Sequence, residues 1–197
     1  MAHLSSPRLA TTAELAGHGM RQRMAEKVVA MRCEAHDALA PDAPLIELAA
    51  VTVQHGRITR ERFHTLLDPQ TTIPRSGTLA HGHSSATLAD CPVWCDVATS
   101  WLAYVRGAQL LVWHAGFHLN CLDRAQRRCG LLAMHSVVAG ITDLREVLNT
   151  RPDGAPARLQ NVLAAHQISC DPAQDGPPQE AEQLARLWLA MSGALQP

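Results

Sequence analysis

The chain has 197 residues, 47% of them hydrophobic and 18% charged, with a formal net charge of -1 at pH 7. These values predict one globular domain with a full core, and the near-zero charge excludes a strongly basic nucleic-acid-binding protein. No apolar run approaches the roughly 20 residues that a membrane-spanning helix needs, so we expect no membrane partner and a cytoplasmic location.

The six cysteines form no C-x-x-C pair and no regular framework spacing. Without such a framework, we expect reduced thiols that behave as small buried residues. A cysteine nucleophile needs an adjacent base, and for Cys33 only His36 or His118 could serve.

Residues 1–26 are expected to form a helical or loose appendage, residues 27–193 the domain and residues 194–197 a short tail. The first strand is predicted at 27–33, where the apolar run Val28-Val29-Ala30-Met31 ends in Arg32-Cys33-Glu34. An apolar run that ends in charged residues is typical of a buried central strand whose carboxyl end carries chemistry.

The rest of the chain alternates between strand-like and helix-like patterns. A Pro-, Gly- and Ser-rich loop is expected at 68–92, and Thr142 is the expected cap of a helix. Further strands are predicted at 45–54, 60–67, 108–113 and 131–136, and helices at 93–105, 117–129, 143–149, 157–166 and 179–191. This order predicts an α/β fold with a mixed sheet of about five strands flanked by helices.

Several segments, in this order, resemble the DnaQ-like 3′→5′ exonucleases of the DEDD superfamily, whose fold is RNase H-like. The sequence PLIELAAVTV at 44–53 is similar to that family's IIEIGAVxV strand. The remaining similarities are Phe63-His64 through Asp68-Pro69 to FHxxLNP, His81-Gly82 to the HGIT stretch, and Gly107 to Phe117 to GAxLVAHNAxFD. Together they cover nearly the whole of residues 27–193.

The resemblance implies a site of four carboxylates that hold two Mg²⁺ or Mn²⁺ ions, with a histidine as general base. In this sequence Glu34 keeps one carboxylate, and Glu180 stands for another aspartate. Arg32 replaces a metal-binding aspartate, His118 replaces the aspartate after the aromatic Phe117, and Asp175 replaces the general base.

The charges of these residues determine whether the site can bind divalent metal ions. Two unit charges 4 Å apart interact by roughly 4 kcal/mol at an effective dielectric constant near 20, and a divalent ion doubles that figure. Arg32 therefore turns an attraction for metal into a repulsion, and its guanidinium cannot lose its proton. We expect impaired or absent hydrolysis, with Arg32 in the metal position and paired with Glu34, Glu180 or both.

Three hypotheses about function follow. The first is an inactive exonuclease-like domain retained for binding single-stranded nucleic acid or its 3′ end, with His36, His114 and Phe117 as nucleic-acid-binding residues. The second is an altered metal-dependent phosphodiesterase, with Glu34, Glu180 and His118 as ligands of Zn²⁺, Mn²⁺ or Fe²⁺, joined by His36, His114 and Asp175. Against the second, histidines in a His-rich chain often have only structural roles.

The third hypothesis is a non-enzymatic module that binds a protein partner or forms a homodimer. It depends on the appendage 1–26 and on Trp94, which looks exposed from its place in the sequence. The alternative is that Trp94, Trp101, Trp113 and Trp188 are all core residues.

Overall fold

The computed structural model describes residues 27–37, 42–148, 158–169 and 176–193. The predicted appendage 1–26, the tail 194–197 and Asp175 lie outside these described residues. Within them, a five-stranded sheet has the order β3-β2-β1-β4-β5. Its strands are β1 (Val28–Ala35), β2 (Leu45–Gln54), β3 (Arg57–Leu66), β4 (Gln109–Val112) and β5 (Gly140–Asp143).

The sheet is mixed, as the sequence predicts. β1, β2 and β3 form an antiparallel meander, whereas β4 pairs with β1 and β5 with β4 in parallel. β1 lies at the centre because its apolar run is buried on both faces, which is typical of a strand covered by helices on each side.

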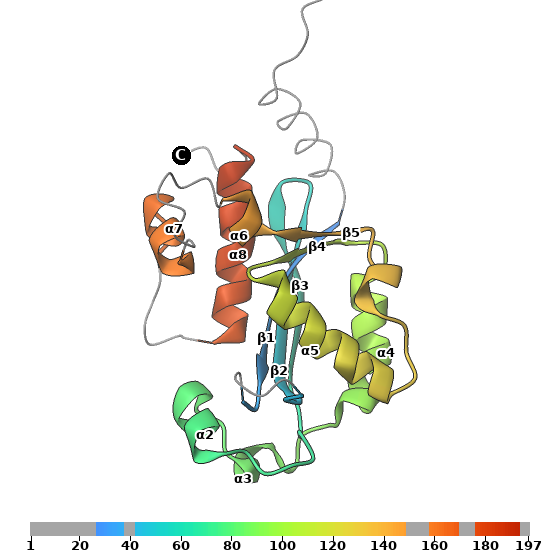
Figure 1. Ribbon diagram of the computed structural model, residues 1–197. Helices are drawn as coiled ribbons and strands as arrows, with labels where there is room; N and C mark the ends of the chain where they lie inside the picture. Colours follow the sequence, from blue (N-terminus) through green and yellow to red (C-terminus); the bar gives the residue numbers. More distant parts are fainter. Residues whose placement is uncertain (1–26, 38–41, 149–157, 170–175, 194–197) are drawn as a thin grey trace, which may run out of the picture.

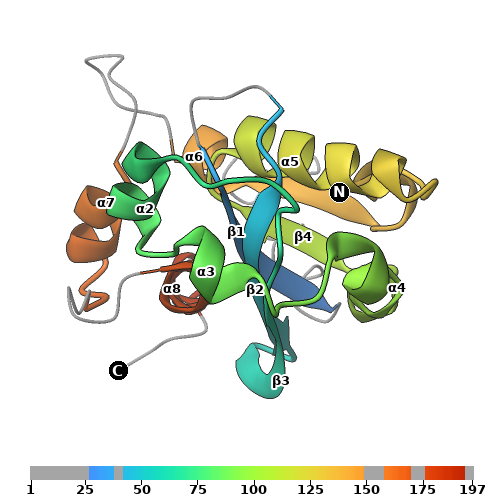
Figure 2. The same cartoon turned by 90° about the horizontal axis from the view of Figure 1, so that it is seen from below.

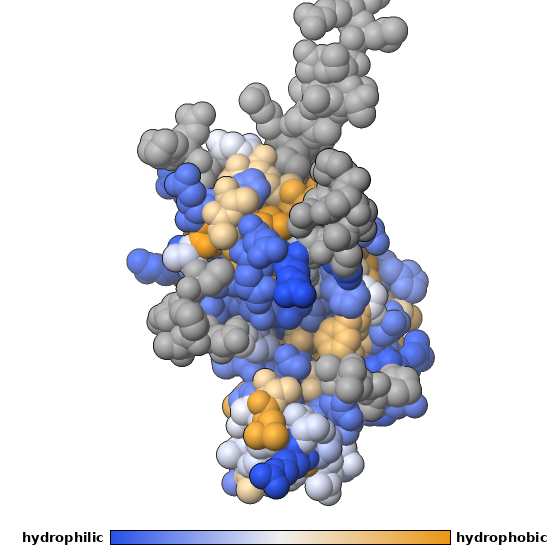
Figure 3. Space-filling view, turned by 60° about the vertical axis from the view of Figure 1, so that its left-hand side comes forward, coloured by the Kyte–Doolittle hydropathy of each residue, from blue (hydrophilic) through white to orange (hydrophobic). Residues whose placement is uncertain are grey.

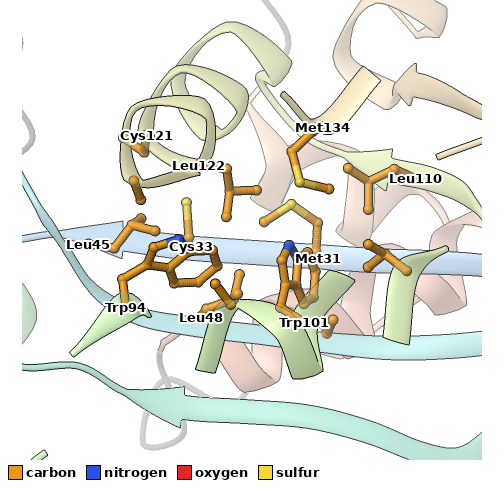
Figure 4. Packing of buried hydrophobic residues seen from close by; sticks show 14 of the residues in the cluster. Met31, Cys33, Leu45, Leu48, Trp94, Trp101, Leu110, Cys121, Leu122 and Met134 are labelled. Atoms are coloured by element: carbon orange, nitrogen blue, oxygen red, sulfur yellow. The ribbon is translucent and has the colours of Figure 1, made fainter. Parts of the chain in front are cut away.

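Helices cover both faces of the sheet (Figures 1 and 2). α4 (Trp94–Val105) and α5 (Ala115–Arg128) pack on one face, over a cluster that contains Met31, Trp101 and Leu122. Figure 4 shows this cluster around β1. α8 (Pro177–Met191) covers the other face together with α6 (Leu144–Val147) and α7 (Leu159–Ala165).

The alternation of β1 decides which side chains enter the site. Val29, Met31 and Cys33 point toward the face of α4 and α5, and Val28 and Ala30 point toward α8. Because successive side chains alternate, Arg32 and Glu34 belong to the α8 face. Cys33 lies between them on the opposite face.

The predicted loop 68–92 contains two short helices, α2 (Arg75–His81) and α3 (Ser85–Leu88), which form a lobe beyond the ends of β1 and β2 (Figure 1). Ser84 caps α3 through a reciprocal capping box with Thr87. The sequence predicts only a loop here because proline and serine usually interrupt helices, whereas in this segment they begin two short ones. Figure 3 shows a hydrophilic band across the middle of the α8 side, with apolar side chains above it and a small apolar patch on the lobe below.

The predicted strand 131–136 is wrong. Residues Met134–Ser136 form a 3-10 turn (η1), and the last strand is β5, which starts later in the chain. The Met134 side chain is buried under α5, and its backbone N–H donates to Asp123 Oδ1 at 2.8 Å. Asp143 rather than Thr142 caps α6.

Two predictions about side chains are also wrong. Cys95 and Cys129 form a disulfide between the start of α4 and the end of α5, because helix packing brings residues 34 positions apart within 5.5 Å at Cα. Trp94 is buried, as are Trp101, Trp113 and Trp188, so the alternative of four core tryptophans is confirmed. No helix of the described residues is long and apolar enough to span a bilayer.

Candidate active site

The predicted site lies where β1 extends beyond the end of β4. The pairing of these two strands stops at Ala30 and Leu111, so Arg32 and Cys33 have no strand beside them on that edge. The first turn of α5 takes this place, and it places His118 against both residues. The Asp143 carboxylate fixes the start of the helix, accepting the backbone N–H groups of His114 at 3.0 Å and Ala115 at 2.7 Å.

The guanidinium of Arg32 is the centre of the site. It forms an ion pair with Glu180 in the first turn of α8, as the sequence predicts. A second nitrogen, Nη1, lies 2.6 Å from Nε2 of His118 and 3.4 Å from the carbonyl oxygen of Trp113, which accepts. Charge-assisted contacts of this kind are the strong hydrogen bonds of proteins, so Arg32 joins β1, α5 and α8.

The protonation of His118 follows from this contact. Its side chain is fully buried. Burial, and next the charge of Arg32, lower the pKa of His118 to about 3. The ring is therefore neutral at pH 7. Arginine can only donate, so Nε2 accepts from Arg32.

Glu34 lies on the same face of β1 as Arg32. Burial raises its pKa, as do the neighbouring carboxylates Glu180 and Glu47, while the Arg32 charge opposes the rise. Glu34 and Glu180 line a cavity of about 510 Å³ between the sheet, the start of α8 and the lobe of α2 and α3.

Sequence reasoning missed the histidines that bind Glu47, which is one of the residues that line this cavity. The nearly buried Glu47 carboxylate lies 2.8 Å from Nε2 of His64 and 3.1 Å from Nε2 of His83. The signal was present, because Glu47 is a lone acid inside the apolar strand 44–53. His81 also lines the cavity and stacks on His83 with ring centroids 5.7 Å apart. Burial lowers the pKa of His81.

The other predicted residues do not converge. His36 leaves β1 toward α2, where its carbonyl oxygen lies 3.4 Å from Nε2 of His81. His114 is exposed, in the left-handed conformation that begins α5. Phe117 is half-buried and packs its edge on the ring of His118, 5.0 Å between centroids.

The residues present do not fit two hard divalent ions. Such ions need oxygen ligands, but positions 32 and 118 supply a permanent cation and a ring whose Nε2 already accepts from it. They do not fit the His/carboxylate site either, because Nδ1 of His118 faces Cys33. Within the described ranges, no three His, Cys, Asp or Glu side chains are grouped so that they could hold a metal ion.

Comparison with known proteins agrees with the fold. The exonuclease family RNase_T matches residues 18–171, a span that ends before α8. DNA polymerase III subunit epsilon of Salmonella typhimurium is 29% identical over 154 residues, and that of Escherichia coli is 28% identical. Each alignment covers 76% of this chain and 62% of the relative, so the chain spans under two thirds of their length.

Solved structures share the fold at much lower identity. E. coli Exonuclease I in complex with a dA16 oligonucleotide superimposes with a TM-score of 0.72 at 13% identity. The superposition covers 86% of this chain and 41% of that one. Apo Exonuclease I gives a TM-score of 0.71 at 12% identity. The predicted RNase H-like exonuclease fold is thereby confirmed.

Proposed function

Because this chain belongs to the RNase_T exonuclease family, we propose that it is a non-hydrolytic member that holds single-stranded nucleic acid at its 3′ end. One observation carries the proposal. The Arg32 guanidinium, paired with Glu180 and bound to His118, takes the position that the family resemblance gives to a metal-binding aspartate. A fixed cation there replaces the charge of an ion but cannot activate water.

The cavity beside Arg32 supports a binding role. Its volume of about 510 Å³ lies within the range of small-ligand sites. Its acidic lining is partly offset, since Glu47 is bound by two histidines and the pKa of Glu34 is raised. Arginine is well suited to phosphate oxygens, and the stacked rings of His81 and His83 offer a flat surface to a base.

Hydrolysis is tested with 5′-labelled single-stranded DNA and RNA in Mg²⁺, Mn²⁺ or Zn²⁺. We expect no shortening with the natural chain, and shortening with an Arg32→Asp, His118→Asp, Asp175→His, Glu180→Asp variant. The matched control carries Arg32→Asn in the same background, which keeps the side chain short but supplies no carboxylate. Cleavage by the natural chain would refute the loss of two-metal chemistry.

Binding is tested by fluorescence anisotropy in EDTA, with a labelled oligonucleotide that ends in a free 3′ hydroxyl. We expect saturable binding that weakens at least about tenfold when Arg32 is replaced by Met, since one charge-assisted contact is worth about 1.5 kcal/mol or more. Arg186→Met, on the exposed face of α8, is the control and should bind as the natural chain does. Equal affinity in all three proteins, or none, would refute the proposed binding role.

A protein partner or homodimer stays a prediction. The appendage on which it was based lies outside the described residues. Light scattering on the full chain and on a chain that starts near residue 26 measures whether the appendage changes the mass in solution.

A further inference from the structure

Two free cysteines meet between β1 and α5. Cys33 on the strand and Cys121 on the helix are both buried, and neither belongs to a disulfide. The two thiols interact, and each shifts the pKa of the other. Figure 4 shows the sulfur of Cys33 pointing from β1 toward α5. The proposed function uses neither thiol.

Cys33 also contacts His118, three residues before Cys121 on the same helix. Nδ1 of His118 lies 3.1 Å from Sγ of Cys33, and the backbone N–H of Cys33 donates to the same nitrogen at 3.4 Å. The Cys33 thiol also lies 4.0 Å from the carbonyl oxygen of His118, which accepts. These contacts hold the sulfur of Cys33 against the first turns of α5, on the side of β1 that faces Cys121.

Cys121 receives a donor from its own helix. Nη2 of Arg124 lies 3.6 Å from its sulfur. The neighbouring Cys33 thiol lowers the pKa of Cys121, and Arg124 lowers it further, against the opposing effect of burial. Within the pair, Cys121 is thus the sulfur with a guanidinium beside it, which favours its thiolate.

Cys121 is also the thiol that a small reagent can reach. It lines a cavity of about 80 Å³ between α4, α5 and the loop after β3, together with Arg124, Arg128 and the Cys95–Cys129 disulfide. A water molecule needs roughly 10–15 Å³ measured in this way, so a peroxide fits. Cys33 does not line this cavity.

We propose that Cys121 and Cys33 form an oxidisable pair, in which Cys121 reacts with hydroperoxides and Cys33 completes a disulfide. The Cys121 thiolate attacks one peroxide oxygen; the O–O bond breaks, and the sulfur becomes a sulfenic acid. The leaving hydroxide takes a proton from solvent and departs as water. The sulfur of Cys33 then attacks that of Cys121, and the released hydroxide takes the Cys33 proton to form a second water. Two thiols are oxidised, and one hydrogen peroxide is reduced to two waters.

The experiment exposes the folded full chain to hydrogen peroxide and quenches it with N-ethylmaleimide in denaturant. Peptides are then mapped by mass spectrometry at acidic pH, where disulfides do not exchange. We expect a linked Cys33–Cys121 peptide that has lost two hydrogens, next to an unchanged Cys95–Cys129 link. A disulfide from Cys121 to any other cysteine, or oxidation confined to the more exposed Cys91, would overturn the proposal.

Two serine variants separate the roles of the thiols. In Cys33→Ser we expect a sulfenic acid that persists on Cys121 and is trapped by dimedone, whereas in Cys121→Ser Cys33 should remain unmodified. Thermal unfolding of both variants confirms that they are folded. Oxidation of Cys33 in the absence of the Cys121 thiol would contradict the assignment.

The contribution of Arg124 has its own matched control. Arg124→Gln should slow the peroxide reaction at least about fivefold, because the thiolate loses a donor. Arg128→Gln, one turn further along the same cavity wall, should change the rate less than about twofold. Equal slowing in both variants would show that general positive charge, rather than the Arg124 contact, controls the reaction.

Discussion

At the scale of single residues, the guanidinium of Arg32 supplies the positive charge that a metal ion would otherwise bring to the site. Its guanidinium faces the Glu180 carboxylate, the Nε2 atom of His118 and the carbonyl oxygen of Trp113. Because removing one partner of such a set leaves the desolvation cost of the others, Arg32 should contribute more to stability than an ordinary surface arginine.

Arg32→Met should lower the free energy of unfolding by about 2–3 kcal/mol, which is less than for a fully buried pair because both side chains are about one fifth exposed. Adding Glu180→Gln should recover part of the loss, since a neutral amide replaces the carboxylate that faced Arg32. Urea unfolding at pH 7 of both single variants and the double variant gives the coupling energy. The control Arg186→Met breaks an exposed pair with Glu182 on the same helix and should cost under about 0.5 kcal/mol. Equal costs for the two arginines would contradict the central role of Arg32.

His118 should make stability depend on pH. Its pKa is about 3 in the folded chain, against an ordinary value of 6.5. Between these values the unfolded chain binds more protons, so stability falls as the pH falls from 6.5 toward 3, by up to about 1.4 kcal/mol per pH unit. His118→Gln keeps an acceptor for Arg32 but does not titrate, so the slope of unfolding free energy against pH should flatten.

Comparing the natural chain with His118→Gln measures the contribution of His118 alone. Glu34 contributes with the opposite sign, because its raised pKa lets protonation favour the folded state, but it is present in both proteins. His166→Gln serves as control, since that ring is exposed at the end of α7, and it should leave the slope unchanged. An unaltered slope in His118→Gln would mean that the buried ring does titrate normally.

The sequence predicts some of these contacts and not others. Arg32 and Glu180 could be paired in advance, because the end of the first strand and the start of the last helix meet in the family fold. The position of His118 against Cys33 could not, since it depends on the pairing of β1 with β4 stopping at Ala30, two residues before Arg32. Neither the spacing of the apolar residues nor that of the site residues shows where this strand pairing stops.

At the scale of elements, strands were easier to predict than the connections between them. β1 and β2 follow from apolar runs of β-branched residues. β5 is only half-buried and has four residues, so its parallel pairing with β4 rather than its own composition makes it a strand. α2 and α3 are defined by local capping and turns, which a Pro- and Gly-rich sequence also offers to irregular loops.

The disulfide between Cys95 and Cys129 links the start of α4 to the end of α5. The bond closes a loop of 34 residues, for which chain entropy predicts a stabilisation of about 2–4 kcal/mol. A Cys95→Ser, Cys129→Ser variant should lose this amount in guanidinium unfolding. Dithiothreitol should destabilise the natural chain similarly and leave the variant unchanged. An effect of the reductant on the variant would point to a different disulfide.

At the scale of the whole molecule, the two faces of the sheet have separate tasks. The α4–α5 face holds the larger apolar cluster, the disulfide and the thiol pair, and the α8 face holds the ion pair and the 510 Å³ cavity. β1 contributes to both through the alternation of Arg32, Cys33 and Glu34. A substitution that shifts this part of β1 should therefore affect the side chains on both faces of the sheet.

This arrangement predicts a fold that does not depend on divalent ions. The thermal midpoint of the natural chain should differ by less than about 1 °C between EDTA and millimolar Mg²⁺ or Mn²⁺, because a ligand stabilises only the state that binds it. The variant with restored carboxylates should be less stable in EDTA and should gain several degrees with metal. A metal-dependent midpoint in the natural chain would reveal a site that the described side chains do not form.

Arg32 also limits how this protein can change. Replacing it alone by aspartate would place a fourth carboxylate near Glu34, Glu47 and Glu180, and neutral His118 would lose the donor of its Nε2 atom. Repulsion between neighbouring carboxylates costs several kcal/mol. We therefore expect Arg32→Asp alone to give a less stable protein with no gain in nuclease activity. The substitutions at positions 32, 118 and 180 therefore depend on one another, and a single mutation is a poor route between an ion-free and a metal-dependent form of this fold.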